Sequence, residues 1–301
     1  MAADNRDNEV LRRIGELPCW SGETEIVPLV GGITNRNYRV TDRTRGQFVV
    51  RLGRDIPEHG VLRFNELAAA RAAHAAGISP EVVFAGEGVL VSRFIEGKTL
   101  APEDVREPRN LSRIVDLLKR CHRDIPRHLE GPALIFWVFQ VARNYLRLLE
   151  ARQSNPYDVP LDTLREKCER LEQALGPVAI VFGHNDLLAA NLIDDGRRLW
   201  LIDWDYAGFN TPLFDLANLA SNNELTRDLE TELLDRYFGP AASGAQRRGF
   251  AAMKCASLLR ETLWGAVSRV TSTIDFDYTG YARDYLARFD RMWASFEAGH
   301  G

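Results

Sequence analysis

The stretch VFGHNDLLAANLI, residues 181–193, places a histidine, two asparagines and an aspartate between two apolar runs. Polar side chains within otherwise buried sequence are costly unless they are paired or have a function. The following stretch, NLIDDGRRLWLIDW, has β-rich arms on either side of Asp195 and Gly196, which predicts a hairpin. Asp186 is therefore expected on a loop after a strand, with Asn191 and Asp203 at the two ends of the hairpin.

Antiparallel pairing brings the ends of a hairpin together, so the Asn191 amide oxygen and the Asp203 carboxylate are predicted to converge beside Asp186. Such oxygen ligands suit Mg²⁺, which binds few protein carboxylates and completes its shell with water and phosphate oxygens. The free Asp186 carboxylate can accept a hydroxyl proton, as phosphoryl transfer requires. Each residue alone is also typical of turns, but the three together favour a catalytic site.

The tripeptide HRD at residues 122–124 matches part of the protein-kinase catalytic loop. Leu129 stands five positions after Asp124, where that loop has an asparagine, and no hairpin follows. We interpret this HRD as the polar end of a helix. His184 is assigned a supporting role, that of orienting the loop backbone.

The first hundred residues predict strands around one helix, and the rest is mainly helical apart from residues 178–206. The helix is expected over the alanine-rich residues 62–77, with Gly77 as its stop. The sequence therefore predicts the α+β class, with a small antiparallel sheet lobe, residues 1–96, and a larger helical lobe, residues 97–301, that contains the catalytic loop and hairpin. The expected strands are residues 25–30, 37–42 and 47–53, and two more within 81–97.

Composition limits the possible functions. The chain has 301 residues, of which 45% are hydrophobic, and a net charge of −4, so no global positive field for nucleic acid is expected. No apolar run approaches the roughly 18 residues of a spanning helix, which predicts no membrane insertion and a cytoplasmic protein. The four cysteines are scattered singly, which argues against a zinc site or a disulfide framework.

Two upstream features are candidates for nucleotide binding. Arg51 lies within the apolar run FVVRL, and a strand arginine that points inward needs a partner, for which Glu66 on the following helix is the nearest candidate. The alternative is that Arg51 faces solvent. The segment GGITNRNY offers glycines for close backbone approach and side-chain donors, although a plain hairpin turn is the alternative. Its candidate phosphate-binding residues are Gly31, Gly32, Thr34 and Asn35.

HNDLLAANLI and LIDWDYAGFNTPLFDLANL, with GGITNRNY and FVVRLG upstream, resemble the choline and ethanolamine kinase family within the aminoglycoside phosphotransferase-like group. The resemblance implies a protein-kinase-like bilobal fold, ATP and Mg²⁺ as cofactors, and transfer of the γ-phosphoryl group to the hydroxyl of a small amino alcohol such as choline or ethanolamine. It implies that Asp186 is the base. The other implied roles are magnesium binding by Asn191 and Asp203, phosphate orientation by Arg51 and Glu66, and adenine contacts at the hinge residues Phe94 and Ile95.

The same resemblance implies an acceptor site of aromatic and acidic side chains, because π faces and carboxylates hold a quaternary ammonium. Val267 stands where many eukaryotic relatives have a second tryptophan, and Asn222 where they have a pocket glutamate. The implied acceptor residues are Trp264, Phe276 and Tyr278. Asp205 stands where relatives commonly have a glutamate and keeps its charge, and Glu224, close to Asn222 in the sequence, is the candidate substitute for the missing pocket glutamate. Packing in the helical core is the alternative role of the three aromatic residues.

Other functions remain open at this point. The alternative phosphoryl acceptors are thiamine, a sugar and an aminoglycoside. A catalytically silent nucleotide-binding scaffold would be favoured by loss of Asp186, Asn191 or Asp203, and all three are present. Both a monomer and a homodimer are compatible with the sequence.

Overall fold

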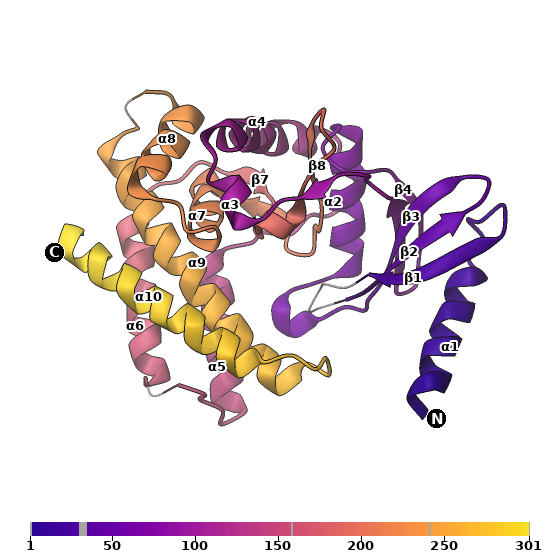
Figure 1. Cartoon of the computed structure of the whole chain (residues 1–301). Helices are drawn as coiled ribbons and strands as arrows, with labels where there is room; N and C mark the ends of the chain where they lie inside the picture. The colour runs from indigo at the N-terminus through magenta and orange to yellow at the C-terminus, as the bar shows by residue number, and fades with distance from the viewer. Residues whose placement is uncertain (1, 30–34, 158, 241, 301) are drawn as a thin grey trace.

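The computed structural model describes residues 2–29, 35–157, 159–240 and 242–300. A small sheet lobe and a larger helical lobe lie side by side, with the N-terminal helix at the outer end of the first and the C-terminus at the far end of the second (Figure 1). The predicted α+β bilobal fold is confirmed. Within the described residues, no helix is long and apolar enough to cross a membrane.

The sheet of the small lobe has five antiparallel strands in the order β1-β2-β3-β5-β4. This confirms the predicted meander and the strand pair after it. In β3, Arg51 pairs with Asn37 on one side and with Leu90 on the other, so it is on a central strand. The strands are β1 Thr24–Leu29, β2 Arg36–Asp42, β3 Gly46–Leu52, β4 Val82–Gly86 and β5 Val89–Arg93.

An N-terminal helix, α1 Ala2–Gly15, packs its second half against the sheet and was not expected from the polar start of the chain. Its apolar residues are few but fall at helical spacing: Ile14 is fully buried, and Val10 and Leu11 pack against the same sheet core. Packing of one narrow stripe is enough to hold such a helix in place, so tertiary contact outweighs the polar composition here.

Helix α2 Arg63–Ala75, predicted from its alanine-rich sequence, stands between the two lobes (Figure 1). Its buried alanines, and Val61 before it, belong to the core of the helical lobe and not to that of the sheet. The Asn65 side chain adds a direct bond, because its Nδ2 donates to the Ala207 carbonyl at 2.8 Å. The sheet lobe is therefore joined to the helical lobe through α2.

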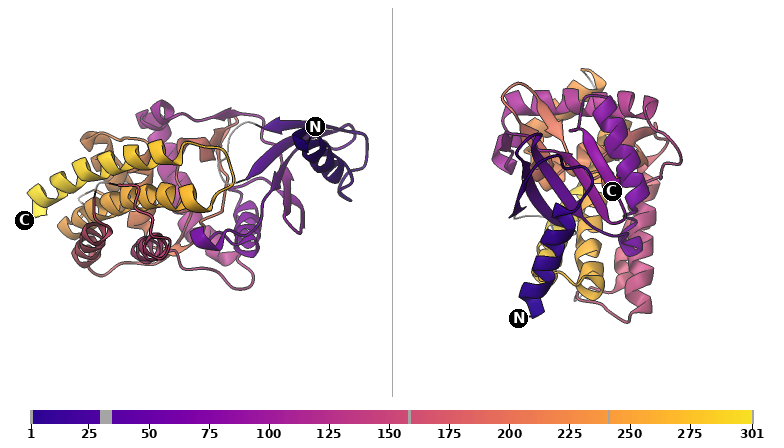
Figure 2. Two further views of the ribbon diagram at one scale, coloured as in Figure 1. Left: turned by 90° about the horizontal axis from the view of Figure 1, so that it is seen from below. Right: turned by 90° about the vertical axis from the view of Figure 1, so that its right-hand side faces the viewer.

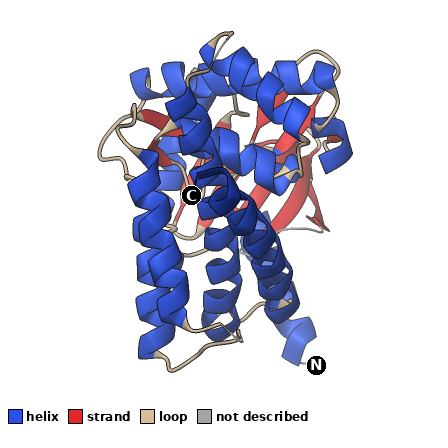
Figure 3. Ribbon diagram, turned by 90° about the vertical axis from the view of Figure 1, so that its left-hand side faces the viewer, coloured by secondary structure: helices blue, strands red, loops and turns tan. Residues whose placement is uncertain are grey.

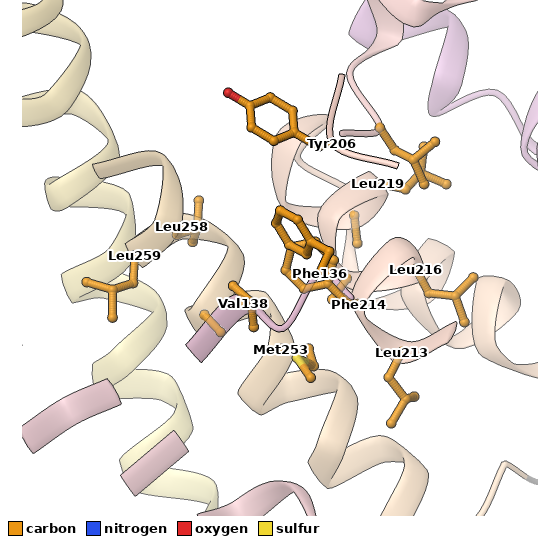
Figure 4. Close-up of a cluster of buried hydrophobic side chains, with 14 of the residues drawn as sticks. Phe136, Val138, Tyr206, Leu213, Phe214, Leu216, Leu219, Met253, Leu258 and Leu259 are labelled. Carbon is orange, nitrogen blue, oxygen red and sulfur yellow. The ribbon is translucent and has the colours of Figure 1, made fainter. Parts of the chain in front are cut away.

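The helical lobe is built around α9 Gly244–Thr271, which is buried over most of its length and packs against α5, α6, α7 and α10. Figure 3 shows these helices covering the strands from the side opposite the sheet lobe. Figure 4 shows side chains of α7 and α9 in this core, where the Phe136 and Phe214 rings lie 5.3 Å apart. The other helices are α3 Pro102–Val105, α4 Pro108–Asp124, α5 Val138–Ala151, α6 Leu161–Leu175, α7 Pro212–Asn222, α8 Arg227–Phe238 and α10 Tyr278–His300.

Short strands in this lobe hold the polar stretch of residues 181–193. The predicted hairpin is confirmed, with Leu192 paired with Leu201 and Gly196 in the left-handed region at φ +84°. The HRD at residues 122–124 ends α4, as predicted. The short strands are β6 Lys98–Thr99, β7 Val181–Gly183, β8 Leu192–Asp194, β9 Leu199–Leu201 and β10 Gly208–Asn210, and β7 pairs with β10 while β6 adds to β8.

Candidate active site

A cavity of about 610 Å³ lies between the two lobes. This volume is in the ordinary range for small-molecule sites. Val49 and Leu90 of the sheet line one side, together with the hinge residues Phe94 and Ile95. The helical lobe contributes Asp186, Asn191, Asp203, Trp264 and Tyr281. Most of the residues singled out in the sequence therefore meet at one cavity.

The structure brings Asp186, Asn191 and Asp203 together as expected. Asn191 Nδ2 donates to the Asp186 carbonyl at 2.8 Å, which leaves the amide oxygen Oδ1 as the other polar atom of this side chain. The Ile202 N–H donates to the Asn191 carbonyl at 3.0 Å and so fixes the two hairpin ends. Asp203 adopts φ +69°, an uncommon conformation for a residue with a side chain. Its Oδ1 is buried and lacks a hydrogen-bond partner in the described structure.

Arg51 connects three carboxylates on the sheet side of the cavity. Its guanidinium lies 2.7 Å from Glu66, 2.7 Å from Asp203 and 2.8 Å from Asp205. The expected pair with Glu66 is present, and the alternative of a solvent-facing Arg51 is wrong because its side chain is only 14% exposed. Burial alone would raise the pKa of Asp203, but the neighbouring Arg51 charge lowers this pKa below its ordinary value.

Arg63 belongs to the same cluster but was not singled out in the sequence. It contacts Glu66 at 2.6 Å and Asp205 at 2.8 Å, and it donates to Asn35 Oδ1 at 2.9 Å. Its position three residues before Glu66, on the same face of α2, was the available signal. Asp205 lines the cavity, but its carboxylate is bonded to Arg51, Arg63 and Asn35, so it is committed to this cluster.

Asp186 lines the cavity and lies beside a buried cation, Arg260, that the sequence did not indicate. Burial raises the pKa of Asp186 to about 7, against the lowering effect of the Arg260 charge. Arg260 is 1% exposed, its Nη1 is 3.3 Å from Asp186 Oδ1, and it forms an ion pair with Glu261. Its guanidinium also lies 4.2 Å from the centre of the Tyr206 ring. A carboxylate with a pKa near neutrality is suited to act as a general base.

The loop that carries Asp186 is held by buried polar groups. Asp215 of α7 accepts from the backbone N–H groups of His184 and Asn185 at 2.9 and 2.8 Å, and His122 Nε2 lies 2.9 Å from Oδ2, the oxygen that also accepts from His184. His184 is fully buried, and its Nδ1 accepts from the Asp186 N–H at 3.3 Å, which agrees with the supporting role assigned to it. Asp215 was not singled out, although it is in the quoted stretch FDLANL.

Replacing Asp215 by alanine is expected to lower the free energy of unfolding by about 3–5 kcal/mol, because the buried groups it bonds lose their partner. The hydrogen bond from His122 lowers the pKa of Asp215 against the effect of burial. A carboxyl with a lowered folded-state pKa stabilises above its ordinary pKa of about 4, and this contribution is lost as the pH falls further. The difference between wild type and variant should therefore shrink in acid.

Urea unfolding of both proteins at neutral and acidic pH measures this effect. Asp235→Ala is the matched control, since Asp235 forms an ion pair with Arg247 at 3.0 Å in which both side chains are more than a third exposed. Such a surface pair contributes about 0–1 kcal/mol. Equal losses of stability in the two variants would contradict the buried role of Asp215.

Trp264, which the sequence suggested for the acceptor site, lines the cavity, and its Nε1 donates to the Tyr206 hydroxyl at 2.8 Å. Tyr281 lines it as well and donates its hydroxyl to Glu261 Oε2 at 2.8 Å, but neither Tyr281 nor Glu261 was singled out in the sequence. Tyr281 is one helical turn into α10, where a helix that begins at Tyr278 turns it toward Trp264.

The remaining acceptor candidates lie outside the cavity lining. Tyr278 is buried and packs edge-on against Trp264, at 5.9 Å between ring centres, and Phe276 is 39% exposed and packs on Tyr278. The Glu224 side chain is 67% exposed and lies 3.6 Å from Arg288. Val267 is fully buried, and the Asn222 side-chain oxygen and nitrogen are buried without a partner in the described structure.

Three candidates for phosphate binding, Gly31, Gly32 and Thr34, lie outside the described residues. Asn35 is described and buried, and it links Asp205 to Arg63. Phe94 continues the sheet past β5, because its N–H donates to the Gln47 carbonyl at 3.0 Å. The hinge backbone is thus held beside the cavity that Phe94 and Ile95 line.

Comparison with known proteins gives consistent matches. The family model described as choline/ethanolamine kinase matches residues 26–235. Ethanolamine kinase 2 of Rattus norvegicus is 30% identical over 312 residues, covering 94% of this chain and 80% of the relative. Protein LicA of Haemophilus influenzae is 30% identical over 214 residues, covering 69% of this chain but only 61% of LicA. The crystal structure of a choline/ethanolamine kinase family protein from Mesorhizobium loti matches with a TM-score of 0.76 and 28% identity, covering 96% of this chain and 98% of that one.

Proposed function

Because the chain belongs to the choline/ethanolamine kinase family and is therefore an amino-alcohol kinase, we propose that its cavity transfers the γ-phosphoryl group of ATP to the hydroxyl of ethanolamine or choline. The observation that carries this proposal is the meeting of Asp186, Asn191 and Asp203 with Arg51 in one cavity that ends at Trp264. The division of the chain into lobes at residues 96–97, a cytoplasmic location and a monomeric or homodimeric state remain predictions.

The nucleotide is proposed to enter from the sheet side. Phe94 and Ile95 would border the adenine through the hinge backbone, and Arg51 would orient the phosphates. The three carboxylates around Arg51 support this role, since they fix its guanidinium in the cavity wall. Phosphate contacts from Gly31, Gly32 and Thr34 remain predictions.

The side-chain oxygens of Asn191 and Asp203 are the proposed ligands of Mg²⁺. Their chemistry fits, because Mg²⁺ prefers oxygen ligands and Asp203 Oδ1 is buried without a partner among the described residues. When bound, Mg²⁺ neutralises charge on the transferred phosphoryl group. Arg51 holds the other Asp203 oxygen at 2.7 Å and so fixes the direction of the free one.

Asp186 is the proposed general base that accepts the hydroxyl proton of the acceptor. Its pKa of about 7 matches proton transfer near neutral pH. Arg260 holds one carboxylate oxygen at 3.3 Å, which leaves the other to face the acceptor. Asp186 therefore acts from a fixed position, as an efficient general base must.

The acceptor cation is proposed to lie at Trp264 and Tyr281. When Asp186 is ionised, as a general base must be, Asp186 and Glu261 contribute two negative charges and Arg260 contributes one positive charge, so the net charge at this end is −1. That balance suits an acceptor with a single ammonium group better than an aminoglycoside with several. The π faces of Trp264 and Tyr281 add cation–π attraction.

Steady-state ADP release with ATP and Mg²⁺ tests this proposal across ethanolamine, choline, thiamine and kanamycin. We expect the highest kcat/KM with ethanolamine or choline, because they match the charge and size of the Trp264 end. Faster turnover with thiamine or kanamycin would replace the proposed acceptor but keep the reaction. No turnover with any of the four would count against the proposal as a whole.

A further inference from the structure

The segment between β3 and α2 leaves the sheet and contacts the helical lobe. It contains one turn of 3₁₀ helix, η1 Pro57–His59, closed by mutual backbone bonds of 2.8 and 3.1 Å between Ile56 and Val61. The turn packs against α5 and α9, and Figure 1 shows it beyond the lower end of α2, toward those helices. In Figure 2 the connection from α9 to α10 likewise lies on the side of the helical lobe that faces the sheet lobe. The segment that follows Arg51 thus reaches the acceptor side of the molecule.

His59, at the end of this turn, is a buried titratable side chain that the proposed mechanism does not use. It is 6% exposed. Its Nδ1 is 3.0 Å from the Tyr145 hydroxyl of α5, and its Nε2 is 3.0 Å from the Ser268 hydroxyl of α9. A neutral imidazole has one donor and one acceptor nitrogen, and each hydroxyl can serve either, so both ring nitrogens are satisfied. Hydrogen bonds to α5 and α9 of the helical lobe therefore fix the orientation of the imidazole ring.

The His59 ring packs on Trp264, with 5.4 Å between ring centres and 33° between planes. Trp264 lines the cavity, whereas His59 is absent from the described lining, so His59 contacts the indole outside this lining. Ser268 follows Trp264 by one turn of α9, so its hydrogen bond to His59 holds the imidazole beside the indole. Burial, followed by the Arg260 charge, lowers the pKa of His59 to about 3, so the imidazole that packs on Trp264 is neutral.

We infer that His59 is a positioning residue for the acceptor: it holds Trp264 from behind in the orientation that lines the cavity. This inference rests on the proposed function, because it assumes that Trp264 contacts the acceptor. It assigns part of the acceptor site to a segment that is continuous with the strand carrying Arg51. Substitutions in this segment should accordingly change acceptor binding and leave ATP binding unaffected.

His59→Ala is expected to raise the KM for ethanolamine or choline about two- to tenfold, the range of one lost aromatic contact. The KM for ATP should stay within about twofold, as for sites that share no contacts. Ser268→Ala removes one partner of His59 without opening a cavity beside Trp264, and we expect a smaller rise in acceptor KM only. Steady-state kinetics with each substrate varied in turn measures both values.

Thr271→Ala is the matched control, since the Thr271 hydroxyl donates at 2.9 Å to the Val267 carbonyl of its own helix and not to His59. A role of His59 in stability alone would lower the melting temperature and leave both KM values unchanged, which would overturn the inference. Equal increases in the two KM values would overturn it as well. If His59→Ala does not fold, Ser268→Ala decides between these outcomes. Absence of wild-type turnover would instead count against the proposed function.

Discussion

Asp186→Asn is expected to lower kcat by about 10²–10⁴-fold, the range of a lost general base. Asparagine keeps the size of the side chain and one oxygen for Arg260, but it cannot accept the acceptor's proton. The loop should keep its shape, because it is held through the backbone N–H groups of His184 and Asn185. Affinity for ATP should therefore stay within about twofold of wild type.

Steady-state kinetics measures the expected loss of kcat, and calorimetry measures whether the affinity for ATP is unchanged. Asp162→Asn is a matched control, because Asp162 is on the surface of α6 with its side chain 86% exposed. The control should have wild-type kinetics. Wild-type turnover in Asp186→Asn itself would show that another group accepts the proton.

Asp203→Ala is expected to abolish the magnesium dependence of ATP binding and to lower kcat/KM by more than about 100-fold, since metal stabilisation of the transferring group is typically several kcal/mol. The variant loses the buried Oδ1, which has no hydrogen-bond partner among the residues that the structure describes, and it also releases Arg51 Nη2, which Asp203 holds at 2.7 Å. Glu66 and Asp205 still bond Arg51, so the cation should remain in the cavity wall.

Calorimetry of ATP with and without Mg²⁺ measures the proposed metal role separately from the chemistry. Asp205→Asn is the informative comparison, because Asp205 also pairs with Arg51 but both of its carboxylate oxygens have protein partners. Arg51 and Arg63 contact Oδ1, and Asn35 donates to Oδ2. Magnesium should still strengthen ATP binding in that variant. An unchanged magnesium effect in Asp203→Ala would remove Asp203 from the metal site.

The central part of the site was predictable because local rules determine it. A hairpin with an Asp-Gly turn brings its ends together, so Asn191 and Asp203 had to meet close to Asp186. Glu66 follows Arg51 on the next helix, and a buried arginine needs a carboxylate, which was enough to pair them. These arguments depend on strand pairing and chain connectivity, which short stretches of sequence contain.

The missed residues depend on packing between distant parts of the chain. Arg260 contacts Asp186 although the two residues are 74 positions apart in the sequence, and Asp215 contacts the loop of Asp186 from α7. No local sequence pattern indicates either contact. The placing of the aromatic residues proposed for the acceptor depends on where α10 begins: Tyr281, in its first turn, lines the cavity, whereas Phe276, two residues before the helix, is 39% exposed. Helix α1 was missed because its burial comes from a narrow stripe ending at Ile14.

The most direct test of the account is to identify the phosphorylated product by ³¹P NMR, with ATP, Mg²⁺ and either ethanolamine or choline. The account predicts an acceptor phosphomonoester formed in step with ADP by the wild-type protein, and almost none in the same time with Asp186→Asn. ADP accompanied only by inorganic phosphate would mean that water, and not an amino alcohol, receives the phosphoryl group. That result would contradict the proposed function of the cavity.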